Sequence, residues 1–144
     1  MPGITVGVDG SDNSLRAMEW AMREAAQHHA ALTVLTVNQV AVTFWNTPII
    51  LPEDKTAEEN ARRAAEEAVA KIASQLGDSQ PVSVSVRAVS GLPAEEFIKA
   101  SHDSDQLVLG SRGTGGFARL MLGSVSSQVV EHATCPVTIV PVRR

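Results

Sequence analysis

The sequence changes from apolar residues to glycines and polar residues within one stretch, Gln106-Leu107-Val108-Leu109-Gly110-Ser111-Arg112-Gly113. Two small residues, Gly123-Ser124, follow after nine further residues. The run 106–109 is short and apolar, which is typical of a buried parallel strand. Glycines beside a strand end let the backbone approach a ligand closely, and the free N–H groups of a turn and of a following helix favour anions. Ser124 is suited to cap that helix. We therefore predict a strand, a phosphate-binding loop and a helix in this order.

The loop after this strand matches neither of two common phosphate-binding motifs. A Walker A loop reads G-x-x-x-x-G-K-[ST], and no lysine follows Gly115 or Gly116. A dinucleotide fingerprint reads G-x-G-x-x-G and belongs after the first strand of a domain, where no such pattern occurs. The loop therefore indicates a nucleotide site of another kind.

Predicted strands and helices alternate along the chain. The patterns predict strands over residues 4–8, 32–37, 82–87, 106–109 and 137–142, and helices from Ser11 or Asp12, over about 54–76, from 93 through 98 and over 124–133. This alternation favours an α/β fold, doubly wound around a mostly parallel sheet, and 144 residues suit a single domain, 1–144. Such folds bind ligands at the carboxyl ends of their strands, where the strand order reverses.

Residues 38–53 interrupt this alternation, because they are apolar, contain prolines and show no clear period. A loop of this length in a compact domain is usually functional or disordered. Phe44, Trp45 and Ile50 either pack down as a flap, which we favour, or form a surface for a partner. The residues alone leave both possibilities open.

Composition argues against several classes of function. The net charge is −4 and only 3% of the residues are aromatic. The chain therefore has neither a positive electrostatic potential to attract nucleic acid nor a set of aromatic rings on which bases could stack, and we expect no nucleic-acid partner. The single cysteine forms no internal disulfide and fits a reducing compartment. No signal-peptide pattern, membrane-length apolar run or metal-ligand spacing is found. We expect a cytoplasmic protein without a membrane segment or a metal held by side chains alone.

Three ordered matches along the chain resemble the universal stress protein family. The stretch Thr5–Ser11 resembles its first strand and turn, Leu107–Gly113 its fourth strand and loop, and His132–Val137 its ending. The nucleotide-binding members carry G-x2-G-x9-G-[ST], which is matched here by Gly110, Gly113, Gly123 and Ser124. Together the matches cover nearly the whole chain.

The resemblance implies a Rossmann-like, five-stranded, mostly parallel sheet of order 3-2-1-4-5, in which the strands ending at Asp9 and Gly110 flank one crevice. The implied ligand is ATP, with or without Mg²⁺. Its adenosine part would lie against Asp9 and the backbone near Gly7 and Val37. Its phosphates would lie against the loop and the start of the last helix, where the candidate residues are Gly110, Ser111, Arg112, Gly113, Thr114, Gly115, Gly116, Arg119, Gly123, Ser124 and Val125.

Several of these residues have a simpler alternative role. Asp9 is also a common residue at the start of a turn into a helix. Arg112 and Arg119 are either surface charges or the cations that offset a polyphosphate in a loop without the Walker lysine. The stretch Thr114–Gly116 is either a phosphate contact or only a small, flexible tip.

We expect an ATP-binding regulator of the universal stress type, whose nucleotide changes its conformation or its partner binding. The sequence contains no recognisable nucleophilic triad and no carboxylate pair placed by a motif, so any ATP hydrolysis should be slow. Three alternatives remain: a sensor of AMP or cyclic AMP, an ATP-using transferase, and an interaction module with a merely structural nucleotide. The resemblance also implies a homodimer formed through the last strand, Val137 to Val142.

Overall fold

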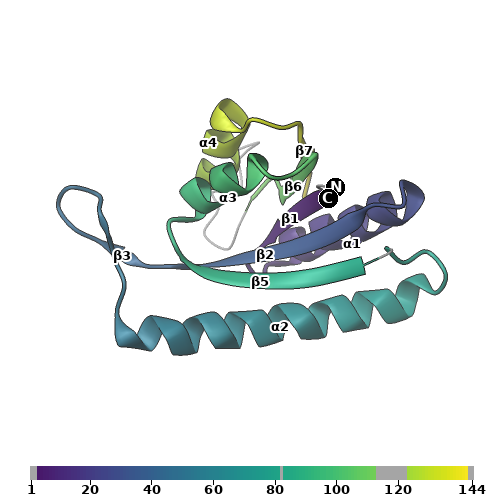
Figure 1. The fold of residues 1–144 in the computed structure, drawn as a ribbon, viewed down its shortest axis with the longest axis horizontal. Coiled ribbons are helices and arrows are strands. Elements are labelled where there is room, and N and C mark those ends of the chain that lie inside the picture. Colours follow the sequence, from purple (N-terminus) through teal and green to yellow (C-terminus); the bar gives the residue numbers. More distant parts are fainter. Residues whose placement is uncertain (1–2, 82, 113–122, 143–144) are drawn as a thin grey trace.

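A central parallel sheet organises the molecule, as seen in a computed structural model that describes residues 3–81, 83–112 and 123–142. The sheet has the order β5-β2-β1-β6-β7, and each neighbouring pair is parallel (Figure 1). Its strands are β1 (Ile4–Val8), β2 (Ala31–Gln39), β5 (Ser83–Gly91), β6 (Gln106–Gly110) and β7 (Val137–Val140). Counted along the chain as five core strands, this order is 3-2-1-4-5, so the prediction is confirmed.

Within the described residues, four helices cover the two faces of the sheet: α1 (Asp12–Gln27), α2 (Pro52–Leu76), α3 (Pro93–Ser101) and α4 (Ser124–His132). Figure 1 shows α3 and α4 on the opposite side of the sheet from α2. Buried residues of α1 and α2 share one hydrophobic cluster with Val6, Val34 and Val108, whereas α3 and α4 share a second cluster with Leu35 and Leu107. Neighbouring strand residues therefore face opposite layers, as the pleat of a strand requires.

The first helix begins where its sequence predicts. Ser11 is the N-cap, and its side chain accepts a hydrogen bond from the Ser14 N–H at 3.2 Å. Met18 and Met22, one turn apart, are fully buried against the sheet. The helix ends at the C-cap His28. Local capping and a 3.6-residue apolar period are sufficient to specify this element.

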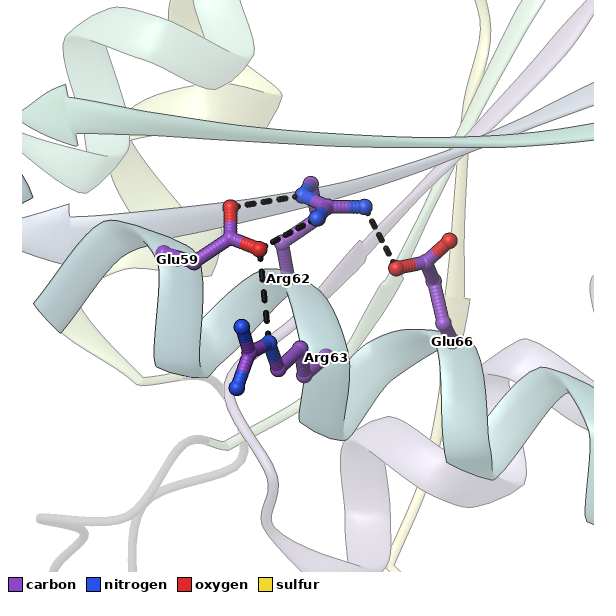
Figure 2. A network of polar contacts seen from close by, with 4 residues as sticks. All are labelled: Glu59, Arg62, Arg63 and Glu66. Carbon is purple, nitrogen blue, oxygen red and sulfur yellow. Dashed lines mark hydrogen bonds and ion pairs between the residues drawn. The ribbon is translucent and has the colours of Figure 1, made fainter. Parts of the chain in front are cut away.

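The second helix is amphipathic and carries an ion-pair network on its more exposed side. Glu59 is paired with Arg62 and also with Arg63 at 3.4 Å, while Arg62 contacts Glu66 at 2.5 Å (Figure 2). The hydrogen bond from Arg62 lowers the pKa of Glu59, and the same bond raises the pKa of Arg62. Because these side chains are solvated, the network contributes little to folding.

Residues 38–53 do not form the structureless flap that we favoured. β2 continues to Gln39, and a short antiparallel hairpin of β3 (Ala41–Val42) and β4 (Pro48–Ile49) follows. Phe44 is 92% exposed and Trp45 is 81% exposed, so they do not pack down onto the sheet. They contact each other edge to face, with ring centroids 5.3 Å apart. The hairpin extends away from the sheet beyond the end of β2 (Figure 1).

The chain after the glycine loop differs from the prediction at two points. Gly123, rather than Ser124, is the N-cap of α4, because its backbone is extended and its carbonyl accepts the helical hydrogen bond from the Ser127 N–H at 2.9 Å. Ser124 is therefore the first helical residue. The last strand ends at Val140 instead of Val142, since Pro141 has no N–H with which to continue a ladder.

Candidate functional site

A cavity of about 530 Å³ opens at the carboxyl ends of β1, β2 and β6. This is the point where the strand order reverses, with β2 on one side of β1 and β6 on the other. The volume is within the range of small-molecule sites. The predicted site residues that line the cavity are Gly7, Asp9, Val37, Gly110, Arg112, Gly123, Ser124 and Val125. The predicted residues Gly113, Thr114, Gly115, Gly116 and Arg119 lie outside the described part of the chain.

Two predicted glycines are required by the packing of the cavity wall. A Cβ atom on Gly7 would lie 2.6 Å from the Leu109 side chain and 2.7 Å from the Phe97 ring. A Cβ atom on Gly110 would lie 2.8 Å from Oδ1 of Asn13. Glycine at these positions therefore lets neighbouring side chains approach the backbone, which is a different role from the close ligand contact that the sequence predicts.

Ser111 does not line the cavity, although it was predicted as a site residue. It is 4% exposed, and its N–H donates to the Val140 carbonyl at 2.9 Å. Its hydroxyl donates to Asn13 Oδ1 at 3.3 Å, and its carbonyl accepts from the Gly123 N–H at 2.6 Å. These contacts tie the end of β6 to β7 and to the start of α4.

Asn13, which the sequence analysis missed, holds this side of the cavity together. Its side chain is buried, and Oδ1 accepts a hydrogen bond from the Arg112 N–H at 2.9 Å while Nδ2 donates to the Val140 carbonyl at 3.1 Å. One amide thus joins α1, the loop after β6 and the end of β7. An asparagine in the first turn of a helix is an ordinary local feature, so nothing in the sequence marks this role.

Arg112 carries the most informative polar atom of the site. Its Nε is buried, and it has no hydrogen-bond partner within the described residues. A buried donor without a partner is costly, and such atoms in native proteins require an explanation. Because the residue lines the cavity, an anionic ligand would supply the missing acceptor and match the positive charge of the guanidinium.

Asp9 forms the turn considered for it and also lines the cavity. Its Oδ1 accepts a hydrogen bond from the Ser11 N–H at 3.0 Å, which forms the turn into α1. Its own N–H donates to the Ser14 hydroxyl at 3.2 Å. The residue also lines the cavity, from the end of β1. The turn therefore positions a carboxylate at the middle strand of the site.

A side-chain network that the sequence analysis missed lies at the β2 side of the cavity. Asn38 lines the cavity, and its Nδ2 donates to Asp54 Oδ1 at 3.0 Å and to Ser90 Oγ at 3.2 Å. Ser90 donates in turn to Glu58 Oε2 at 2.7 Å, and Asp54 Oδ2 accepts from the Leu51 N–H at 2.7 Å. The network joins β2, β5 and the first turns of α2.

Other kinds of site receive no support in the described ranges. No group of three His, Cys, Asp or Glu residues there is placed to hold a metal ion, and no helix there is long and apolar enough to cross a membrane. Burial raises the pKa of the Cys135 thiol, which keeps it in its less reactive protonated form.

The sheet order defines a doubly wound α/β protein with a cavity at the point where the strand order reverses. The model of the universal stress protein family matches residues 2–141, and the chain belongs to this family. The chain is 37% identical over 139 residues to a universal stress protein of Mycolicibacterium smegmatis, covering 96% of this chain and 47% of that protein. It is 31% identical over 143 residues to universal stress protein YxiE of Bacillus subtilis, covering 95% and 97%.

Solved structures share the fold. The universal stress protein UspA from Lactobacillus plantarum has a TM-score of 0.74 at 28% identity, with 96% of this chain and 97% of that chain covered. A universal stress protein in complex with cAMP has a TM-score of 0.67 at 24% identity, covering 97% and 96%. A universal stress protein from Archaeoglobus fulgidus in complex with dAMP has a TM-score of 0.58 at 22% identity, covering 97% and 98%. The chain spans about half the length of the mycobacterial relative.

Proposed function

We propose that this chain is an ATP-binding regulator, with or without Mg²⁺ at the phosphates. The observation that carries the proposal is the buried Nε of Arg112, which has no hydrogen-bond partner among the described residues and belongs to a residue that lines the cavity together with Asp9 and the end of β2. Arg112 would face the phosphates, together with the amide groups at the start of α4. Asp9 would accept hydrogen bonds from the ribose hydroxyls or the adenine amino group. Occupation of the cavity would then stabilise one arrangement of the elements around it.

Two fold relatives support an adenine nucleotide as the ligand. They contain cAMP and dAMP, which have the adenine base in common. The same observation favours a second candidate function, a sensor of AMP or cyclic AMP. ATP is preferred here because G-x2-G-x9-G-S, together with Arg112, offers more donors than one phosphate requires. A transferase function would need an acceptor site, for which the apolar hairpin is the only spare segment among the described residues.

The proposal includes an assembly and a location. β7 is an edge strand of the sheet, and an exposed edge is a ready template for pairing with another chain. Pairing through the 137–142 segment would form a homodimer of single-domain protomers. The acidic composition and the single, unreactive cysteine fit a cytoplasmic protein without a nucleic-acid partner. Hydrolysis of ATP would be slow, with the bound state rather than turnover as the signal.

The test is to denature freshly purified protein, identify any released nucleotide by chromatography, and titrate the stripped protein with ATP, AMP and cyclic AMP by calorimetry. ATP should bind best, and Arg112→Gln should lower its affinity about 10- to 100-fold, as the loss of a charge-assisted hydrogen bond implies. AMP affinity should fall less. Arg63→Gln, on the exposed face of α2, is the control and should bind like the parent.

Two results would contradict the proposal. If the unsubstituted protein, after removal of any bound nucleotide, does not bind adenine nucleotides, the proposed function is wrong. Tighter binding of AMP or cyclic AMP than of ATP, with Arg112→Gln unchanged for ATP, would favour the sensor instead.

A further inference from the structure

The side-chain amide of Asn38 has one orientation that its surroundings allow. Nδ2 has two protons, and both are used, one by Asp54 Oδ1 at 3.0 Å and one by Ser90 Oγ at 3.2 Å. A carboxylate only accepts hydrogen bonds. An amide turned the other way would place its oxygen against this carboxylate and lose the bond.

Ser90 reinforces the same orientation. A hydroxyl has a single proton, and that of Ser90 is donated to Glu58 Oε2 at 2.7 Å. Towards Asn38, the Ser90 oxygen can therefore only accept. Both neighbours require the amino end of the amide, so the network assigns Nδ2 and Oδ1 of Asn38 without ambiguity.

The atom left over is Oδ1, and it belongs to a residue that lines the cavity. Because Nδ2 is fully committed to Asp54 and Ser90, the Asn38 side chain has an acceptor and no donor left for a further partner. Asn38 lies at the end of β2, whereas Arg112 follows β6, with β1 between them. Two strand spacings amount to about 10 Å. A ligand that spans the cavity would thus meet a cation at one end and a hydrogen-bond acceptor at the other.

We infer that Asn38 Oδ1 selects the base of the bound nucleotide by accepting a hydrogen bond from an exocyclic amino group. This inference rests on the proposed function, since it concerns the base end of the same ligand. Adenine carries an amino group at its six-position, whereas hypoxanthine and guanine carry a carbonyl oxygen there. A carbonyl facing Oδ1 leaves two acceptors without a proton between them, and a polar group left unpaired in the complex discriminates between ligands.

The experiment compares ATP with inosine triphosphate on stripped protein by calorimetry. The two ligands share ribose and phosphates and differ at the six-position of the purine and its adjacent ring nitrogen. We expect the parent to bind ATP at least 10-fold more tightly. In Asn38→Ala the ratio should fall towards one, chiefly through weaker ATP binding. Glu66→Gln, in the α2 ion-pair network, is the matched surface control and should keep the parent ratio (Figure 2).

A second variant tests the orienting network without altering the cavity lining. Ser90→Ala removes one of the two acceptors that hold Nδ2, so the amide is held by Asp54 alone. The ratio of the two affinities should fall by a smaller factor than in Asn38→Ala. An unchanged ratio in Ser90→Ala would contradict the orienting role even if Asn38→Ala does not fold.

The outcomes separate this inference from the proposed function. Equal binding of ATP and inosine triphosphate by the parent, or a parent-like ratio in Asn38→Ala, overturns the role of Asn38 and leaves ATP binding intact. Failure of the parent to bind ATP overturns the proposed function and this inference with it.

Discussion

The two sides of the cavity are built in different ways. On the β6 side, a single buried amide, that of Asn13, contacts the backbone at Arg112 and Val140. On the β2 side, Asn38 is held by a chain of partly exposed side chains that includes Asp54 and Ser90. Where one buried residue contacts two segments of backbone, its loss leaves the Arg112 N–H without its acceptor. Where the support is shared between side chains near water, each loss is partly compensated by solvent. Substitutions on the β6 side should therefore lower the free energy of unfolding more than substitutions on the β2 side.

The largest effect is expected from Asn13→Ala. The change leaves the Arg112 N–H and the Ser111 hydroxyl without the acceptor Oδ1, while the Val140 carbonyl keeps the Ser111 N–H as a donor. Each group left unpaired in a buried setting costs on the order of 1–3 kcal/mol. The free energy of unfolding should fall by about 3 kcal/mol, measured by urea denaturation. Asp12→Ala, at the neighbouring exposed position, is the control and should cost about 0.5 kcal/mol. A loss of similar size in the two variants would show that Asn13 is not the support of the β6 side.

Gly110→Ala should have the next largest effect and can be tested for coupling to Asn13. The added Cβ atom would lie 2.8 Å from Asn13 Oδ1, and such overpacking costs about 2 kcal/mol. In the Asn13→Ala background this atom is absent, so the same glycine substitution should cost less. A double-mutant cycle from urea unfolding measures the difference. Additive losses would contradict the close contact that defines this side of the cavity.

Asp54→Ala tests the tolerance of the β2 side. It removes the acceptor for Asn38 Nδ2 and for the Leu51 N–H, both of them in a partly or fully exposed setting. We expect a loss of about 1 kcal/mol, since water replaces these hydrogen bonds in part. Thermal unfolding of Asp54→Ala beside Asn13→Ala compares the two sides directly. A loss as large as that of Asn13→Ala would remove the contrast between them.

The smallest effect concerns the α2 surface network, which lies outside both sides of the cavity. Arg62 lowers the pKa of Glu59 below its ordinary value of 4.5, so this carboxylate stabilises the fold above that pH. The contribution is lost as the pH falls from 4.5 through the folded-state pKa. Arg62→Gln should weaken the dependence of the melting temperature on pH in this acidic range and change the melting temperature little at neutral pH. An unchanged acid profile would show that the pair does not matter in solution.

The fold was predictable from the sequence in most respects. Strand and helix patterns depend on local period and capping, so β1 followed from the run Ile4–Val8 and α1 from the cap at Ser11. The strand order came instead from the resemblance to the universal stress protein family. Predictions failed where a boundary depends on distant contacts. Gly123 becomes the N-cap of α4 instead of Ser124, in a backbone held by the Ser111 carbonyl. Phe44 and Trp45 are apolar but exposed, because the hairpin leads them away from the sheet.

The parallel α/β fold and the places of Asp9, Gly110 and Arg112 at or just after strand ends could be inferred from the sequence, because side-chain period and glycine placement are local properties. The support of these residues depends on contacts between distant parts of the folded chain. Asn13 donates to the carbonyl of Val140, 127 residues further along the chain, and Asn38 donates to Ser90, 52 residues further along. A hydrogen bond between residues so far apart cannot be predicted from composition or residue spacing, because it forms only after the sheet has brought its strands together.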